Sequence, residues 1–211
     1  MLTTGRSTVS PSGGALRERI LECARRLCFG AGVEALSARK IAAQVGCSAT
    51  AIYLHFDSID HLLHELRMEG HALLSDYLRR PPAEVDAVDR LCAMQREYHR
   101  FGVENPNYFR LMFLNRVDRA ELGTLVAGEG ATLQIVADAA RIGLETGQIR
   151  AGLDALVVAN VAWMAVHGIT SMIVSGHAAV TAPGLESTLI AAANDSLRAW
   201  LSPGAAVGAL Q

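Results

Sequence analysis

Apolar residues recur every three to four positions along most of this chain, which is the spacing of one buried face of an α-helix. The spacing predicts nine helices and no strand, and therefore an all-α protein. Two of the helices are short and lie within residues 36–56, and another begins at Pro106. The longer helices are expected over about residues 15–30, 59–80, 84–104, 131–146, 155–175 and 183–200.

The two short helices within residues 36–56 are predicted to be joined by a tight turn. Ser37 precedes the first helix, where its hydroxyl can accept a backbone N–H, and Gly46 ends it in the left-handed conformation that glycine adopts without strain. Ser48 precedes the second helix in the same way. The positions left on the open side of that helix are small or polar: Ala49, Thr50, Tyr53 and His55. A short helix with such a face fits the major groove of DNA, so the pattern is typical of a helix-turn-helix motif.

Four short stretches resemble a known family. They are residues 32–37 (Gly-Val-Glu-Ala-Leu-Ser), 41–42 (Ile-Ala), 45–48 (Val-Gly-Cys-Ser) and 52–56 (Ile-Tyr-Leu-His-Phe). Over about residues 16–66 the chain resembles the DNA-binding domain of the tetracycline-repressor (TetR) family. The resemblance implies an all-helical homodimer that blocks transcription until a small molecule binds its C-terminal domain. The chain departs from the family at Ile59, where family members usually have a lysine that contacts a DNA phosphate.

The C-terminal part resembles one TetR subgroup, named WHG for a Trp and His-Gly signature. That signature corresponds here to Trp163, His167 and Gly168, preceded by Asn105-Pro106 and the aromatic stretch at 108–113. The resemblance and the helix pattern together divide the chain into four parts. These are a flexible arm at 1–14, a helix-turn-helix DNA-binding domain at 15–60, an effector-binding and dimerisation domain at 61–202, and a tail at 203–211.

Eight residues are expected to contact double-stranded DNA, in the form of a palindromic operator. They are Ser37, Arg39, Lys40, Ser48, Ala49, Thr50, Tyr53 and His55. Ala49 and Thr50 would approach base edges, whereas Ser37, Arg39, Lys40 and His55 would hold the phosphate backbone. The resemblance implies that the Tyr53 hydroxyl binds a phosphate. An alternative is that Tyr53 only packs.

Charge supports this assignment locally. The net charge of the whole chain is −2, which excludes a uniformly basic nucleic-acid binder. Residues 1–60 nevertheless contain seven Arg or Lys against five Asp or Glu. A small basic excess can hold phosphates when it lies on one face.

Cofactor and metal chemistry are not predicted. The four cysteines form no Cys-x-x-Cys pair, and each occupies a position that suits a small apolar residue in a helix. His61, His64 and His71 lie on one predicted helix without a carboxylate or cysteine at ligand spacing. The sequence therefore predicts no cofactor, no metal, and a reduced, cytoplasmic protein.

A ligand cavity is expected around the densest cluster of aromatic and Met side chains. The predicted lining is Tyr98, Phe101, Phe109, Met112, Phe113, Trp163, Met164 and His167, with His167 as the polar group. Large apolar side chains with few charges favour a small, mostly apolar effector. One alternative is a helical enzyme that uses the same cluster as a substrate pocket, although no arrangement of catalytic residues supports it. Another is that Trp163 and His167 only brace the fold.

The stretch 155–185 contains no Asp, Glu, Lys or Arg, and is long enough to cross a bilayer. Its Asn, His, Gly and Ser residues and the lack of basic flanks argue against a membrane span. A helix that is apolar all round also suits a protein whose core and partner subunit cover opposite faces. We therefore expect no membrane association and a homodimer formed through the last two helices. The stripe Leu189, Ala193, Leu197 and Trp200 would belong to that interface.

Overall fold

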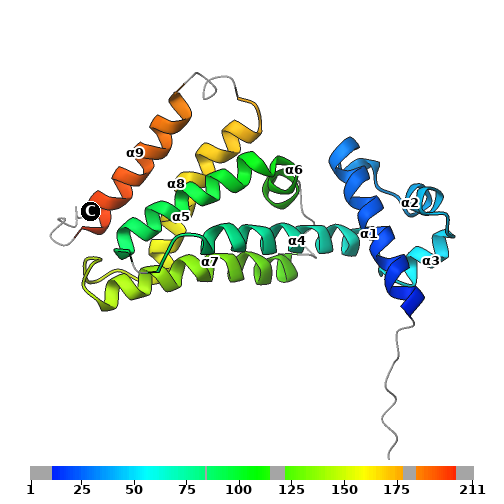
Figure 1. Ribbon diagram of the computed structural model, residues 1–211, viewed down its shortest axis with the longest axis horizontal. Coiled ribbons are helices and arrows are strands. Elements are labelled where there is room, and N and C mark those ends of the chain that lie inside the picture. The colour runs from blue at the N-terminus through cyan, green and yellow to red at the C-terminus, as the bar shows by residue number, and fades with distance from the viewer. Residues whose placement is uncertain (1–10, 84, 115–121, 178–183, 203–211) are drawn as a thin grey trace, which may run out of the picture. The chain divides into compact units, whose positions relative to one another are not determined.

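A computed structural model describes residues 11–83, 85–114, 122–177 and 184–202, without the side chains of 11–13 and 122–129. The chain divides into two compact units, Met1–Arg67 and Met68–Gln211. Every regular element in the described ranges is helical (Figure 1), so the all-α prediction is confirmed.

The first unit is a small helical domain. Its elements are α1 (Pro11–Ala31), the 3₁₀ turn η1 (Val33–Ala35), α2 (Ala38–Val45), α3 (Ala49–Tyr53) and the first part of α4 (Ile59–Arg79). The core contains the fully or almost fully buried side chains of Ile20, Ala24, Ile41, Ile52, Phe56, Leu62 and Leu66. Their three-to-four spacing within each helix is the pattern that the sequence shows. Helix α1 begins at Pro11, four residues before its expected start, and residues 1–10 of the predicted arm lie outside the described residues.

The second unit is built around α5. It contains the rest of α4, then α5 (Ala87–Glu104), α6 (Pro106–Phe109), the π-helical turn η2 (Arg110–Leu114), α7 (Leu122–Glu145), α8 (Ala155–Val174) and α9 (Leu185–Leu201). Helix α5 packs against α7, α8 and α9, and α8 also packs against α7 and α9 (Figure 1). Apolar side chains from all of these helices form one core.

Side-chain caps determine where two of the long helices begin. The Asp86 carboxylate accepts the backbone N–H groups of Val88 and Asp89, so α5 begins at Ala87, three residues after its predicted start. The Asp154 carboxylate caps α8 in the same way. Both caps satisfy N–H groups that the first helical turn leaves without an acceptor.

The prediction differs from the structure at the start of α7. The glycines at 123, 128 and 130 predicted a loop or an irregular helix start up to residue 131, but α7 begins at Leu122. Isolated glycines weaken a helix by about 1 kcal/mol each without breaking it, and packing of the following residues compensates for that cost. The predicted loop residues 115–121 lie outside the described residues.

Helix α8 has one buried and one exposed face. It is the only helix in the described part of the chain that is long and apolar enough, by length and composition, to cross a membrane. Val158, Ala162 and Val166 are buried against the core of the second unit. The exposed apolar side chains of the helix are Leu156, Val157, Val161, Met164 and Met172. A helix packed on α5, α7 and α9 along one face is a core helix with an apolar outer stripe.

Candidate functional site

The turn between α2 and α3 has the geometry that the sequence predicts. Ser37 is extended, and its Oγ accepts the backbone N–H of Lys40 at 3.3 Å. Gly46 ends α2 in the left-handed region, with φ 76° and ψ 42°. The Oγ of Ser48 then accepts the N–H of Ala51 at 3.1 Å and starts α3. The two helices are therefore joined by three residues, with both N-termini capped.

Two arginines of α1 form hydrogen bonds with the C-terminal end of α2. The guanidinium of Arg19 donates to the backbone oxygen of Val45 at 2.5 Å, at the C-terminal end of α2. The guanidinium of Arg26 donates to Oε1 of Gln44 at 2.9 Å. A cation at a helix C-terminus is favoured by the helix dipole as well as by the hydrogen bond. Arg19 and Arg26 thus position α2.

The residues predicted to contact DNA lie on α2, α3 and the positions that flank them. Six of the eight are exposed: Arg39, Lys40, Ser48, Ala49, Thr50 and Tyr53. Ser37 and His55 are half-buried. Sequence reasoning missed Leu54, which directly follows α3 and is 80% exposed. Tyr53 is 53% exposed, so Leu54 adds an exposed apolar side chain to the same short segment.

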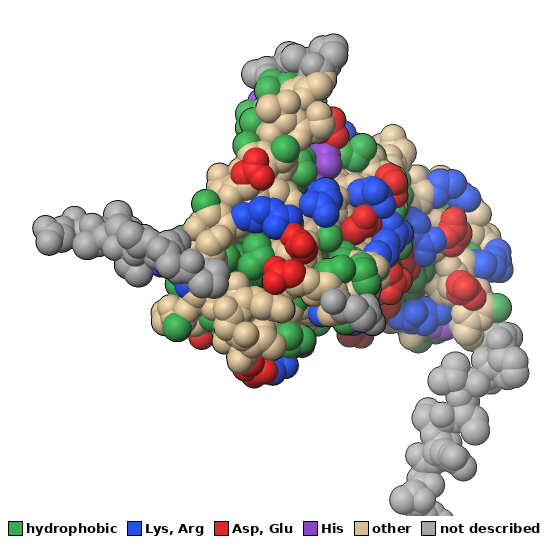
Figure 2. Space-filling model, turned by 60° about the vertical axis from the view of Figure 1, so that its left-hand side comes forward, with side chains coloured by type: hydrophobic (Ala, Val, Ile, Leu, Met, Phe, Trp, Pro, Cys, Tyr) green, Lys and Arg blue, Asp and Glu red, His purple; other side chains and the backbone are tan. Residues whose placement is uncertain are grey.

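The face shown in Figure 2 carries no continuous basic patch. On the face shown in Figure 2, Lys and Arg side chains alternate with Asp and Glu side chains. This mixture agrees with the net charge of −2. The assignment of a nucleic-acid interface rests on the geometry of α2 and α3.

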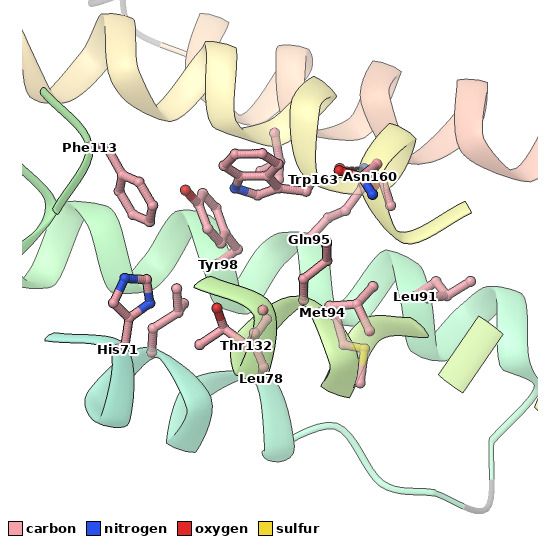
Figure 3. Close-up of a pocket in the computed structure, with 16 residues that line it drawn as sticks. His71, Leu78, Leu91, Met94, Gln95, Tyr98, Phe113, Thr132, Asn160 and Trp163 are labelled. Carbon is pink, nitrogen blue, oxygen red and sulfur yellow. Dashed lines mark hydrogen bonds between the residues drawn. The ribbon is translucent and has the colours of Figure 1, made fainter. Parts of the chain in front are cut away.

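The second unit contains a cavity of about 240 Å³ (Figure 3). Sixteen residues from α4, α5, η2, α7 and α8 line it, and none of these sixteen is Lys, Arg, Asp or Glu. Its apolar wall includes Leu74, Leu78, Leu91, Met94, Leu133, Val136 and Val166. The polar lining residues are His71, Gln95, Tyr98, Thr132 and Asn160.

A cluster of rings lies at one end of this cavity. The ring of His167 stacks on Phe109 at 5.6 Å between centroids and lies 5.1 Å from Trp163. Its Nδ1 is 2.7 Å from the Tyr98 hydroxyl, and its Nε2 is 3.2 Å from Oγ of Ser171. Burial lowers the pKa of His167, because the charged imidazolium loses its hydration in this apolar surrounding.

The eight predicted lining residues fall into three groups. Tyr98, Phe113 and Trp163 line the cavity. Phe101, Phe109, Met112 and His167 are not among the lining residues; the first three are buried in the core, and His167 contacts the wall residue Tyr98. Met164 is 57% exposed and does not line the cavity. The correction has a simple reason: Met164 follows Trp163 by one residue, which turns its side chain by about 100° around the helix.

Sequence reasoning missed the contribution of α4 to the cavity. The sequence indicates for His71 no role beyond that of a metal ligand with no carboxylate or cysteine at ligand spacing, yet it is 3% exposed and its ring lies 6.0 Å from that of Phe113. With Leu74 and Leu78 it forms the i, i+3, i+7 pattern of one helix face. That spacing indicates in the sequence that His71 belongs to the buried face of α4. Gln95 and Asn160 were missed as well, because no local pattern distinguishes a polar cavity residue from a solvated one.

The π-helical turn η2 contacts both the cavity and the part of α4 around Gly70. Phe113, in η2, lines the cavity, whereas the neighbouring Met112 lies against Gly70 of α4. A Cβ atom at Gly70 would be 2.4 Å from Sδ of Met112, so the two elements approach as closely as a glycine allows. The Tyr108 hydroxyl also donates to Oε2 of Glu69 at 2.9 Å. A displacement of Phe113 would therefore be transmitted to α4 through these contacts.

These features define a class: an all-helical protein with a helix-turn-helix unit and a second helical unit that contains a ligand-sized cavity. A sequence model described as bacterial regulatory proteins of the tetR family matches residues 20–66. A second, described as a tetracyclin repressor-like C-terminal domain, matches residues 91–195. Together the two stretches make up more than two thirds of the chain. The chain belongs to the tetR family of bacterial regulatory proteins.

Similar proteins agree with this family. The HTH-type transcriptional regulator Rv1816 of Mycobacterium tuberculosis is 30% identical over 148 residues, which cover 64% of this chain and 60% of that protein. This chain thus spans about 60% of the length of the curated relatives it matches. A protein of unknown function from Rhodococcus sp. RHA1 has a similar structure, with a TM-score of 0.75 and 26% identity over 95% of this chain and all of that one.

A more distant structure shares the fold. The transcriptional regulator FadR of Bacillus subtilis, solved in complex with stearoyl-CoA, has a TM-score of 0.70 and 17% identity over 87% of this chain and 98% of that one. The families and relatives are regulators, so the alternative of a helical enzyme is set aside.

Proposed function

We propose that this protein is a cytoplasmic, homodimeric transcriptional repressor, which a small and mostly apolar effector releases from a palindromic operator. The observation that carries the proposal is the capped, exposed α3, which follows an α2 held by α1 across a turn with the geometry of a helix-turn-helix. The uncharged cavity of the second unit supplies the effector site. Trp163, His167 and Gly168 support assignment to the WHG subgroup of the family.

Base reading is assigned to the N-terminal part of α3. Thr50 and Ala49 are exposed at the start of this helix, where recognition helices approach base edges. The threonine hydroxyl can donate and accept a hydrogen bond, and its methyl group can contact thymine. Tyr53, one turn after Ala49, would give its hydroxyl to a phosphate.

Backbone contacts are assigned to the ends of the two helices. Arg39 and Lys40 are exposed in the first turn of α2, and His55 follows α3. Ser37 and Ser48 use their hydroxyl oxygens to accept backbone N–H groups, but each retains its own O–H for a phosphate oxygen.

Dimerisation is assigned to the outer stripe of α8 together with α9. Val157, Val161, Met164 and Met172 are exposed at helical spacing, and Gly168 lies in the same series. In the described part of the chain, no atom outside the backbone of α8 itself lies within 4 Å of a Cβ placed on Gly168, which leaves room for a partner helix to approach. The predicted stripe of α9 needs a correction, because Leu197 is buried within its own chain. Two α8 and two α9 helices would then form a four-helix interface around a two-fold axis.

Release requires the effector to favour a conformation that does not fit the operator. The two recognition helices of a dimer must match successive major grooves, about 34 Å apart. Helix α4 begins in the first unit and ends in the second, and its second part contacts the cavity through His71 and η2 through Gly70. An effector that weakens DNA binding a hundredfold must bind the DNA complex a hundredfold more weakly, a coupling of about 2.7 kcal/mol.

The comparison with FadR supports an apolar effector. That protein was solved with an acyl-CoA, so this fold can accommodate a ligand with a long apolar part. The cavity described above has a largely apolar wall, which suits the apolar part of such a ligand.

DNA footprinting and sedimentation test the proposal together. We expect the purified protein to protect a palindrome in the DNA that flanks its own gene, and to sediment as a dimer at micromolar concentration. Met164→Glu should shift the protein to a monomer and weaken the footprint, since it puts a charge into the proposed interface. The matched control is Glu145→Gln, at an exposed position of α7. A monomeric wild type that still binds its palindrome tightly would contradict the dimer, and absence of any protected site would contradict the repressor.

A further inference from the structure

The buried polar side chains of the cavity wall include one amide. Gln95 of α5 is 3% exposed, lies between apolar neighbours, and is directed toward the α8 side of the cavity in Figure 3. Burying an amide without partners costs about 1–3 kcal/mol in proteins. The partners of Gln95 therefore determine what it offers to the cavity.

These partners form a directed chain of hydrogen bonds. The guanidinium of Arg96 donates to Oδ1 of Asn194 at 2.7 Å. Nδ2 of Asn194 donates to Oε1 of Gln95 at 3.2 Å and also to the backbone oxygen of Ile190 at 2.9 Å. Nε2 of Gln95 donates to the backbone oxygen of Ala162 at 2.8 Å. The chain thus runs from a cation through α9 to α8.

The direction of the chain fixes the orientation of the Gln95 amide. Both hydrogens of the Asn194 amide are used, so Asn194 can only donate to Gln95. A flipped Gln95 would place its NH₂ against the NH₂ of Asn194 and its oxygen against the oxygen of Ala162. Nε2 carries two hydrogens, and Ala162 accepts one of them.

We propose that the second Nε2–H of Gln95 recognises the effector, and that the effector is an uncharged, mainly apolar molecule with a carbonyl-type hydrogen-bond acceptor. This inference rests on the proposed effector function of the cavity. Ketones, esters and lactones belong to this class. Because the chain begins on a guanidinium, each bond polarises the next, which strengthens the donor that Gln95 presents.

The other lining residues fit this selectivity. Nδ2 of Asn160 donates to the backbone oxygen of Leu156 at 2.9 Å, so one of its two hydrogens is engaged by its own helix. Asn160 is only half-buried, whereas Gln95 is buried in the wall, so Gln95 presents the better desolvated donor. Among the sixteen lining residues in the described part of the chain there is no Arg or Lys, so an anionic ligand would lose its hydration without a cation from these residues. The combination favours a neutral acceptor.

The test compares two molecules that differ only at the acceptor. Acetophenone has a carbonyl group where α-methylstyrene has C=CH₂, and both have nine non-hydrogen atoms. Their dissociation constants are measured by titration calorimetry with the full-length wild type and with Gln95→Met. The ratio of the hydrocarbon constant to the ketone constant should fall about two- to tenfold in Gln95→Met, the value of one neutral hydrogen bond.

Two further variants make the result specific. Thr132→Val removes another polar lining group at nearly constant volume, and should leave the ratio unchanged. Asn194→Leu keeps Gln95 but removes the donor that fixes its orientation, and should lower the ratio as Gln95→Met does. It also decides the matter if Gln95→Met does not fold, as judged by circular dichroism. If the ratio is unchanged in Gln95→Met or Asn194→Leu while both molecules still bind, the role of Gln95 is overturned but the proposed effector cavity is not. Failure of the wild type to bind either molecule overturns it together with the proposed effector cavity.

Discussion

The hydroxyl of Tyr98 and Nδ1 of His167 lie 2.7 Å apart, although 69 residues separate them in the sequence. Tyr98 lines the cavity and His167 does not. The tyrosine is therefore held in the wall by a histidine that is itself packed against Phe109 and Trp163. This arrangement makes the hydroxyl a fixed part of the cavity.

Tyr98→Phe should destabilise the protein by about 1–3 kcal/mol. The substitution removes the hydrogen bond and leaves Nδ1 of His167 facing an apolar ring. Urea denaturation followed by circular dichroism measures the change. Tyr53→Phe is the control, because Tyr53 is exposed and should contribute less than about 0.5 kcal/mol. Equal effects of the two substitutions would contradict a structural hydrogen bond at Tyr98.

His167 should make stability depend on pH. Burial lowers its pKa below the ordinary value of 6.5, so the unfolded chain binds a proton near that pH while the folded chain does not. The free energy of unfolding should therefore fall as the pH decreases below about 6.5, by at most about 1.4 kcal/mol per pH unit. Urea denaturation of wild type and His167→Gln between about pH 8 and pH 5.5 measures this, and the difference between the two slopes isolates His167. Parallel curves would show that His167 does not contribute.

Two substitutions on α3 should separate base reading from backbone binding. Thr50→Ala should change the preferred operator sequence, since Thr50 is assigned to base edges. Tyr53→Phe should weaken binding to all sequences alike, because it loses a phosphate contact. A binding-site selection from a random library measures both. A Thr50→Ala protein that selects the wild-type sequence would place a different residue at the bases.

Lys40→Ala should make DNA binding less dependent on salt. Each phosphate contact contributes about 0.9 to the slope of log affinity against log salt concentration. Loss of the Lys40 contact should flatten that slope by about one for each subunit that engages the operator. Lys40→Arg, which keeps the charge, is the control. An unchanged slope in Lys40→Ala would mean that this exposed side chain does not contact phosphate.

Gly102→Ala should destabilise the second unit by about 1–3 kcal/mol. A Cβ at this position would lie 2.3 Å from Cγ2 of Thr170, a buried and stiff β-branched side chain, and 3.1 Å from the Phe109 ring. Gly130→Ala provides the matched control, since among the described residues no atom outside the adjacent backbone lies within 4 Å of its added Cβ, and alanine favours the helix. The midpoint of thermal unfolding should be lower than that of the wild type for Gly102→Ala only. A Gly102→Ala midpoint equal to that of the wild type would show that α5 and α8 can separate without cost.

Local rules predicted the first unit closely. Ser37, Gly46 and Ser48 each act on groups within a few residues, so caps and turn follow from sequence alone. The lining of the cavity is different, because it depends on how helices far apart in sequence are packed. The bond between Asn194 and Gln95 spans 99 residues, and no periodicity indicates it. Met164 illustrates the same difficulty, since apolar residues on α8 occupy both the buried and the exposed face.

The contacts that fasten α2 come from α1, through Arg19 and Arg26. The recognition elements are thus secured by residues of their own unit, Met1–Arg67. A unit of this kind is suited to modular exchange. If this unit is joined within α4 to the ligand-binding unit of another regulator, with the helical register unchanged, the chimera should keep the operator preference of this protein. It should respond to the ligand of the other regulator.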